Sequence, residues 1–97
     1  MRRTVKMAEA YHVGIGAQPS FPDLGGFGRR KMFLSPEEVR NDLTYQIGAL
    51  TAFTDTKSLQ HVKPHGALYN MAVDDDILAS AICQAVKDID PNLILVV

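Results

Sequence analysis

Apolar residues recur at helical spacing in two stretches of the chain. The first predicts a helix from Ser35 to about Phe53, whose buried face consists of Val39, Leu43, Ile47 and Leu50. Its start is marked by the capping box Ser35-Pro36-Glu37-Glu38, with proline at the first helical position. The second helix is expected to open at Asp74-Asp75-Asp76, where acidic side chains suit the positive end of a helix. Its apolar stripe consists of Leu78, Ile82, Ala85, Val86 and Ile89, and Cys83 is expected in the same core.

Three shorter segments have the patterns of β-strands. Residues 13–17 alternate apolar residues with glycine, and residues 59–63 are a second short strand that Pro64 ends. Residues 93–97 are apolar throughout, as in a strand buried in a parallel sheet. An N-terminal helix over Thr4–Tyr11 is also expected, because this segment is rich in helix formers.

The order of these elements alternates helix with strand. Such alternation predicts an α/β fold in which right-handed crossovers connect parallel strands. A three-stranded sheet would leave its edges and part of its faces uncovered. We therefore expect residues 1–97 to be a single partial domain, a segment of something larger.

Charge and composition exclude several classes of protein. Ten Lys and Arg balance eleven Asp and Glu, so the chain lacks the basic footprint of a nucleic-acid binder. The longest apolar run, residues 93–97, is far shorter than the roughly 20 residues of a membrane span. A single cysteine, Cys83, cannot form an internal disulfide and fits a reducing, cytoplasmic setting.

Two loops would follow the carboxyl ends of the first two strands, where α/β folds bind their ligands. One is the long segment 18–34, which is punctuated by glycine and proline. The other is residues 65–73, with a short helical turn expected at 67–71. Both loops concentrate polar and titratable side chains.

The second loop carries residues that resemble a known family. His-Val-Lys-Pro-His-Gly-Ala-Leu-Tyr-Asn, at 61–70, is similar to a signature of the LamB/YcsF family, and Gly16–Asp23 with Gly26–Arg30 is similar to a second one. Residues 45–50 and 90–96 match two further family segments. The resemblance implies a TIM-like (β/α) barrel, of which strands near 13–17, 59–63 and 93–97 would form part.

The resemblance also implies an activity. It is that of the A subunit of ATP-dependent 5-oxoprolinase, which together with subunits B and C opens the lactam ring of 5-oxoproline to give glutamate. ATP would be used by the whole complex, since neither glycine cluster of this chain fits a phosphate-loop template. Exposed sheet edges would also allow homo-oligomers.

Three residues are the candidate catalytic groups. His65 is a candidate acid–base catalyst, because imidazole is the side chain best suited to proton transfer near neutral pH, although a loop-stabilising histidine is the alternative. Lys63 could stabilise an oxyanion or form an ordinary ion pair. Asp23 could orient a base or bind substrate, yet Pro22-Asp23-Leu24-Gly25 is also good turn chemistry.

A second group of residues is expected to bind substrate: Gln18, Ser20, Arg29, His61, Tyr69 and Asn70. Structural roles remain open for each of them, such as capping, packing or a buried polar network. Gln18 stands where the family usually carries histidine, and an amide cannot take over proton transfer from an imidazole. No metal site is expected, because Pro64 and the strand spoil the spacing of His61 and His65.

Two alternatives to the lactam hydrolase remain. The chain could be a truncated, non-catalytic remnant of the family that serves at most as an interaction fragment. It could also be a metal-dependent hydrolase of the polysaccharide-deacetylase type, which would need a cluster of Asp and His ligands.

Overall fold

The computed structural model describes residues 1–97 and contains a three-stranded parallel sheet. Its strands are β1 (Gly16–Ala17), β2 (His61–Val62) and β3 (Ile94–Leu95), in the order β1-β2-β3. Gly16 pairs with His61, which pairs in turn with Ile94. The α/β class and the parallel sheet predicted from the sequence are therefore confirmed, although each strand is shorter than its apolar pattern.

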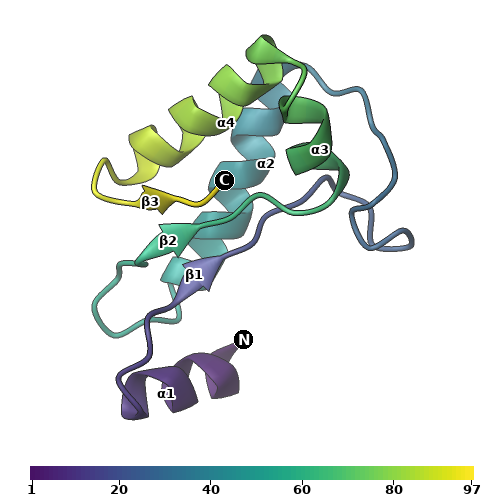
Figure 1. Cartoon of the computed structure of the whole chain (residues 1–97). Coiled ribbons are helices and arrows are strands. Elements are labelled where there is room, and N and C mark those ends of the chain that lie inside the picture. Colours follow the sequence, from purple (N-terminus) through teal and green to yellow (C-terminus); the bar gives the residue numbers. More distant parts are fainter.

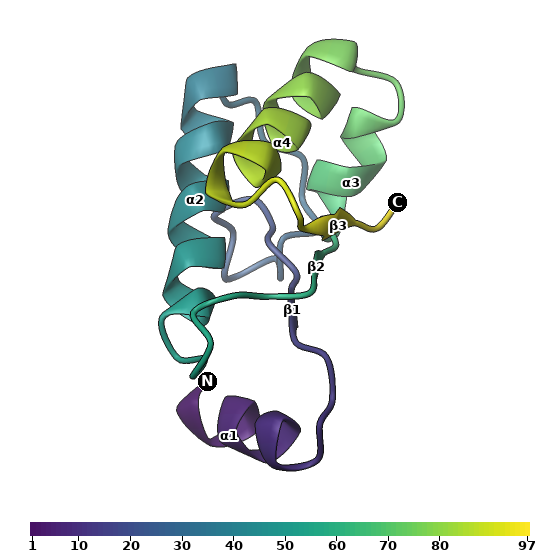
Figure 2. The ribbon, with the colours of Figure 1, turned by 90° about the vertical axis from the view of Figure 1, so that its left-hand side faces the viewer.

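Two long helices cover one face of this sheet. They are α2 (Pro36–Thr51) and α4 (Asp76–Ile89), which lie together on the same side of the strands (Figure 2). The predicted capping box begins α2: the Ser35 hydroxyl accepts the Glu38 N–H at 3.1 Å, and the Glu38 carboxylate accepts the Ser35 N–H at 2.7 Å. At the start of α4 the Asp75 carboxylate accepts the Leu78 N–H at 3.0 Å, without a reciprocal bond.

The core lies between the sheet and these two helices. The second residue of β1 and of β2, Ala17 and Val62, is buried, while Gly16 and His61 are only half-buried on the other face. Figure 2 shows no helix over that other face. The two helices contribute most of the other core residues, in particular Val39, Leu43, Ile47, Ala81, Ile82, Ala85 and Val86.

The N-terminal helix α1 (Arg2–Ala10) lies below the end of α2, apart from the sheet (Figure 1). The Arg2 guanidinium stacks 5.0 Å from the centre of the Phe53 ring, and a Glu9 carboxylate oxygen accepts the Asp55 N–H at 2.8 Å. Only Val5 of this helix is buried, and Tyr11 is exposed. The buried face of this helix therefore consists of one residue. The short helix α3 (Ala67–Ala72) confirms the helical turn expected after β2.

Two expectations about burial are wrong. Cys83 is exposed, because the buried stripe of α4 follows Ala81, Ile82 and Ala85 and leaves residue 83 on its flank. The last strand is not buried throughout, since β3 pairs on one side only and Ile94 is 58% exposed. No helix in the chain has both the length and the apolar character needed to cross a membrane.

Candidate functional site

A polar groove of about 620 Å³ opens beyond the carboxyl ends of β1 and β2. The loop after β1 forms most of its wall, His65 from the loop after β2 forms another part, and α2 closes one side. The groove brings together four of the predicted site residues: Gln18, Ser20, Asp23 and His65.

Main-chain and side-chain contacts fix the ring of His65 in this groove. Its Nε2 lies 2.9 Å from the carbonyl oxygen of Phe27, and its Nδ1 lies 3.4 Å from the amide nitrogen of Gln18. The ring also meets the Phe27 ring edge to face, with 5.2 Å between centroids. A carbonyl oxygen only accepts hydrogen bonds, so Nε2 carries the proton. The lone pair of the neutral imidazole is therefore on Nδ1, the atom able to accept a proton.

An unusual turn presents the Phe27 carbonyl to His65. Phe27 and Gly28 both have positive φ angles, 57° and 70°. A Cβ atom on Gly28 would lie only 2.5 Å from Cβ of Ser20, which leaves no room for another residue type. The Gly28 carbonyl then accepts the Ala67 N–H at 3.0 Å, so the loops after β1 and β2 are joined directly behind His65.

Asp23 acts as a brace within the first loop. Its carboxylate accepts hydrogen bonds from the Arg30 guanidinium and from the Gly26 N–H, the latter at 3.0 Å. The side chain of Asp23 is 6% exposed, whereas that of Arg30 is largely in solvent. The Arg30 hydrogen bond holds the pKa of Asp23 below its ordinary value, so the carboxylate stays charged. The catalytic role of Asp23 stays a prediction beside this structural one.

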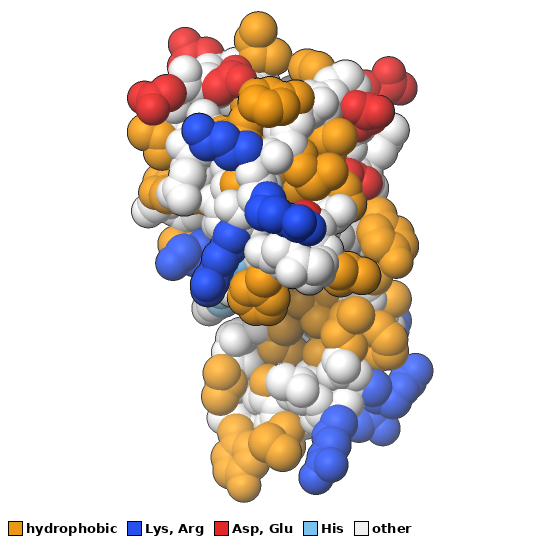
Figure 3. All heavy atoms as spheres, turned by 90° about the vertical axis from the view of Figure 1, so that its right-hand side faces the viewer, with side chains coloured by type: hydrophobic (Ala, Val, Ile, Leu, Met, Phe, Trp, Pro, Cys, Tyr) orange, Lys and Arg blue, Asp and Glu red, His pale blue; other side chains and the backbone are white.

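Cationic side chains gather near the groove. The Arg29 guanidinium lies 5.2 Å from the centre of the Phe27 ring, and Lys63 is exposed directly after β2, without an ion-pair partner. Figure 3 shows Lys and Arg side chains clustered over the middle of this face, with Asp and Glu towards its upper end. Arg29 therefore lies at the edge of a groove whose own lining contains the side chains of Asp23 and Asp42.

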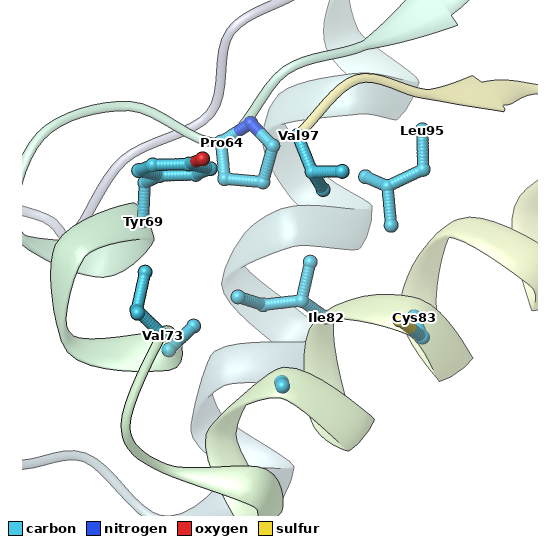
Figure 4. A pocket seen from close by; sticks show the side chains of 9 residues that line it. Pro64, Tyr69, Val73, Ile82, Cys83, Leu95 and Val97 are labelled. Carbon is cyan, nitrogen blue, oxygen red and sulfur yellow. The ribbon is translucent and has the colours of Figure 1, made fainter.

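Besides Arg29 and Lys63, three further predicted residues do not line the groove: His61, Tyr69 and Asn70. His61 bonds to the Gln60 side chain at 3.0 Å, and its ring occupies the space that a side chain at Gly16 would need. Tyr69 lines a separate apolar groove of about 180 Å³ together with Cys83, between α3, α4 and β3 (Figure 4). Asn70 is exposed on α3. Substrate binding by these three residues stays a prediction.

Several residues that line the groove were not predicted. Asp42, Tyr45 and Gln46 come from α2, and Phe27 supplies both a ring and a carbonyl oxygen. One signal in the sequence could have predicted two of them. Asp42 and Gln46 are four residues apart, so they lie on one face of the helix, next to its buried stripe, and this helix follows the loop after the first strand. Sequence reasoning used that stripe only to define the core.

The glycine turns of the site do not form a phosphate cradle. A Cβ atom on Gly66 would overlap the Gly28 carbonyl oxygen, so glycine at residue 66 allows the two loops to approach each other closely. The triphosphate of ATP does not fit these turns, and we derive no step through it. No group of three or more His, Cys, Asp or Glu side chains is placed to hold a metal ion.

The fold and the groove define an α/β protein with a polar site at the carboxyl ends of its parallel strands. The chain belongs to the LamB/YcsF family, whose profile matches residues 1–97. It is 58% identical over 98 residues to the 5-oxoprolinase A subunit of Pyrococcus abyssi, and 60% identical over 97 residues to that of Geobacillus kaustophilus. These alignments cover 99% and 98% of this chain, and 38% of each relative.

A solved structure is similar over the same region. The lactam utilization protein from Thermus thermophilus superposes with a TM-score of 0.92 at 57% sequence identity. The superposition covers 99% of this chain and 40% of that protein. The chain thus spans about two fifths of the length of the relatives it matches.

Proposed function

We propose that this chain carries part of the active site of the A subunit of a 5-oxoprolinase, which opens the lactam of 5-oxoproline to glutamate. The observation that carries the proposal is the combination of near 60% identity to proteins of that name with a groove built around His65. The open sheet face supports a further proposal, that residues 1–97 are one part of a TIM-like barrel.

In this proposal His65 performs the proton transfers. Nδ1 accepts a proton from the attacking water as the water oxygen bonds to the lactam carbonyl carbon. The same nitrogen returns a proton to the ring nitrogen as the carbon–nitrogen bond breaks. Lys63 and Arg29 are the cations available to stabilise the developing oxyanion or to hold the carboxylate of the substrate.

The remaining polar groups of the groove would bind the substrate. Gln18 and Ser20 offer an amide and a hydroxyl to its polar atoms. We assign the ATP dependence to the assembly with subunits B and C, since the glycine turns of this chain are filled by its own backbone.

Gln18 favours a second candidate function, that of a non-catalytic member of the family. Its amide contacts Nδ1 of His65 and cannot carry a proton. If the reaction needs two proton carriers at this place, the chain serves only as an interaction fragment. No observation favours the metal-dependent deacetylase, and we do not propose it.

A chimera distinguishes these candidates. This chain replaces the matching 38% of the A subunit from Geobacillus kaustophilus, and the chimera is combined with subunits B and C, ATP and 5-oxoproline. Glutamate formation that disappears with His65→Ala supports the lactam hydrolase. Full turnover with His65→Ala contradicts the role of His65. An inactive chimera that becomes active with Gln18→His favours the non-catalytic candidate.

A further inference from the structure

The side chain of Gln46 forms a clamp on the first loop. Its Oε1 accepts the Ser20 N–H at 3.0 Å, and its Nε2 donates to the Ser20 carbonyl oxygen at 2.8 Å. A carboxamide that pairs with both main-chain groups of one residue makes the hydrogen bonds that a neighbouring β-strand would otherwise make. It satisfies an N–H and a C=O that no backbone partner serves. The clamp is partly buried, where hydrogen bonds hold a fixed geometry.

A continuous series of contacts leads from this clamp to His65. The Ser20 side chain packs against Gly28, where an added Cβ atom would meet it at 2.5 Å. Gly28 belongs to the positive-φ turn that presents the Phe27 carbonyl oxygen, and this oxygen accepts from Nε2 of His65 at 2.9 Å. Movement of Ser20 away from α2 would therefore remove its packing against this turn, which is held otherwise by main-chain hydrogen bonds such as that of the Ala67 N–H to the Gly28 carbonyl oxygen.

We propose that Gln46 is a positioning residue that fixes the proton-accepting Nδ1 of His65 through Ser20 and the Phe27–Gly28 turn. The coupling between the two side chains is a property of the folded chain. Its catalytic consequence rests on the proposed function of His65. Gln46 touches no reacting group in this scheme, so it acts on the geometry of the imidazole alone.

Two substitutions separate the hydrogen bonds of Gln46 from its volume. Gln46→Leu keeps similar bulk and removes both bonds. Gln46→Glu keeps the acceptor for the Ser20 N–H, but at neutral pH it places a carboxylate oxygen against the Ser20 carbonyl oxygen. Protonation of that carboxylate restores a donor, so Gln46→Glu is expected to regain the clamp at acidic pH.

The test is NMR spectroscopy of the 97-residue chain with labelled histidine and phenylalanine. Wild type is expected to show a nuclear Overhauser effect between the rings of His65 and Phe27, which lie 5.2 Å apart. Gln46→Leu should lose this effect and shift the His65 ring resonances. Gln84→Leu, on the exposed side of α4, is the matched control and should retain both signals.

The acid rescue decides the case if Gln46→Leu does not fold. Spectra of Gln46→Glu and wild type are compared at each pH, because both chains contain His65, Asp23 and Asp42 in the same groove. The proposal is supported if the His65 signals of Gln46→Glu differ from those of wild type at neutral pH and this difference disappears on acidification. His65 signals identical to wild type at neutral pH in either Gln46 variant overturn it.

The same variants in the chimera give a catalytic readout. Gln46→Leu is expected to lower kcat by up to about 100-fold with little change in KM, since misplacement of a reacting group by about 1 Å can cost that much. Unchanged kcat contradicts the catalytic consequence. Because the NMR coupling needs no turnover, failure of the lactam hydrolase assignment and failure of this inference give different results.

Discussion

Substitution of Gly66 by alanine tests the junction between the two loops. Gly66 has φ 64° and ψ −134°, a backbone conformation that residues other than glycine rarely adopt. An added Cβ atom would also overlap the Gly28 carbonyl oxygen, which accepts the Ala67 N–H at 3.0 Å. The alanine therefore strains the backbone, and its Cβ atom also pushes the loops apart and breaks that hydrogen bond.

The expected loss is a sum of two effects of known size. A residue held in such a conformation costs about 1–3 kcal/mol. A lost backbone hydrogen bond costs about 0.5–1.5 kcal/mol more. Together they lower the free energy of unfolding by about 2–4 kcal/mol, a large share of the roughly 5–15 kcal/mol of an ordinary domain.

Urea unfolding followed by circular dichroism measures this loss against a matched control. Gly48 lies in the exposed part of α2, and no atom lies within 4 Å of the position of its Cβ. Gly48→Ala is expected to stabilise the chain by about 0.5–1 kcal/mol, because alanine is the better helix former. A Gly66→Ala chain as stable as wild type would refute the close approach of the two loops.

Four further outcomes are expected. Ile47→Ala, at a fully buried position of α2, should lower the free energy of unfolding by about 2–5 kcal/mol in urea unfolding. Ser35→Ala should lose about 1 kcal/mol in the same assay, because the N-cap of α2 disappears. Arg30 lowers the pKa of Asp23 below 3.8, so the charged carboxylate stabilises the fold above that pH, and the contribution is lost as the pH falls through the lowered pKa. Asp23→Asn should therefore flatten the fall of stability at acidic pH, measured by urea unfolding at a series of pH values. Cys83 should react with a thiol reagent in the folded chain as readily as in the unfolded chain, since it is exposed.

The helices and the parallel order could be predicted because their signals are local. Ser35 and Glu38 are three residues apart and specify the start of α2 by themselves. The stripes of α2 and α4 identify the faces that meet the sheet. Cys83 was misplaced because residues at i and i+1 differ by about 100° around a helix, and the apolar stripe was drawn too wide.

The groove itself could be predicted only as a region. The resemblance and the strand-end rule placed His65, Gln18 and Ser20 correctly near one another. Neither the resemblance nor the strand-end rule could tell that Tyr69 lies apart from these three residues. Its position on α3 places it in the other groove, and this depends on how α3 packs. The partner of the His65 ring is a carbonyl oxygen of Phe27, and a main-chain atom carries no signature in the sequence.

Because the partner of His65 is the Phe27 carbonyl oxygen, different residues set the orientation of the imidazole and form the surface of the groove. The orientation of His65 depends on the Phe27–Gly28 turn, and the turn depends on Gly66 behind it and on Ser20 beside it. Side chains on the groove surface, such as Gln18, contact the imidazole without setting the turn. Changes among these surface groups can therefore alter which ligand binds while the position of Nδ1 is preserved. Changes to the two glycines act on the position of Nδ1 itself, even though neither glycine offers a functional group to a ligand.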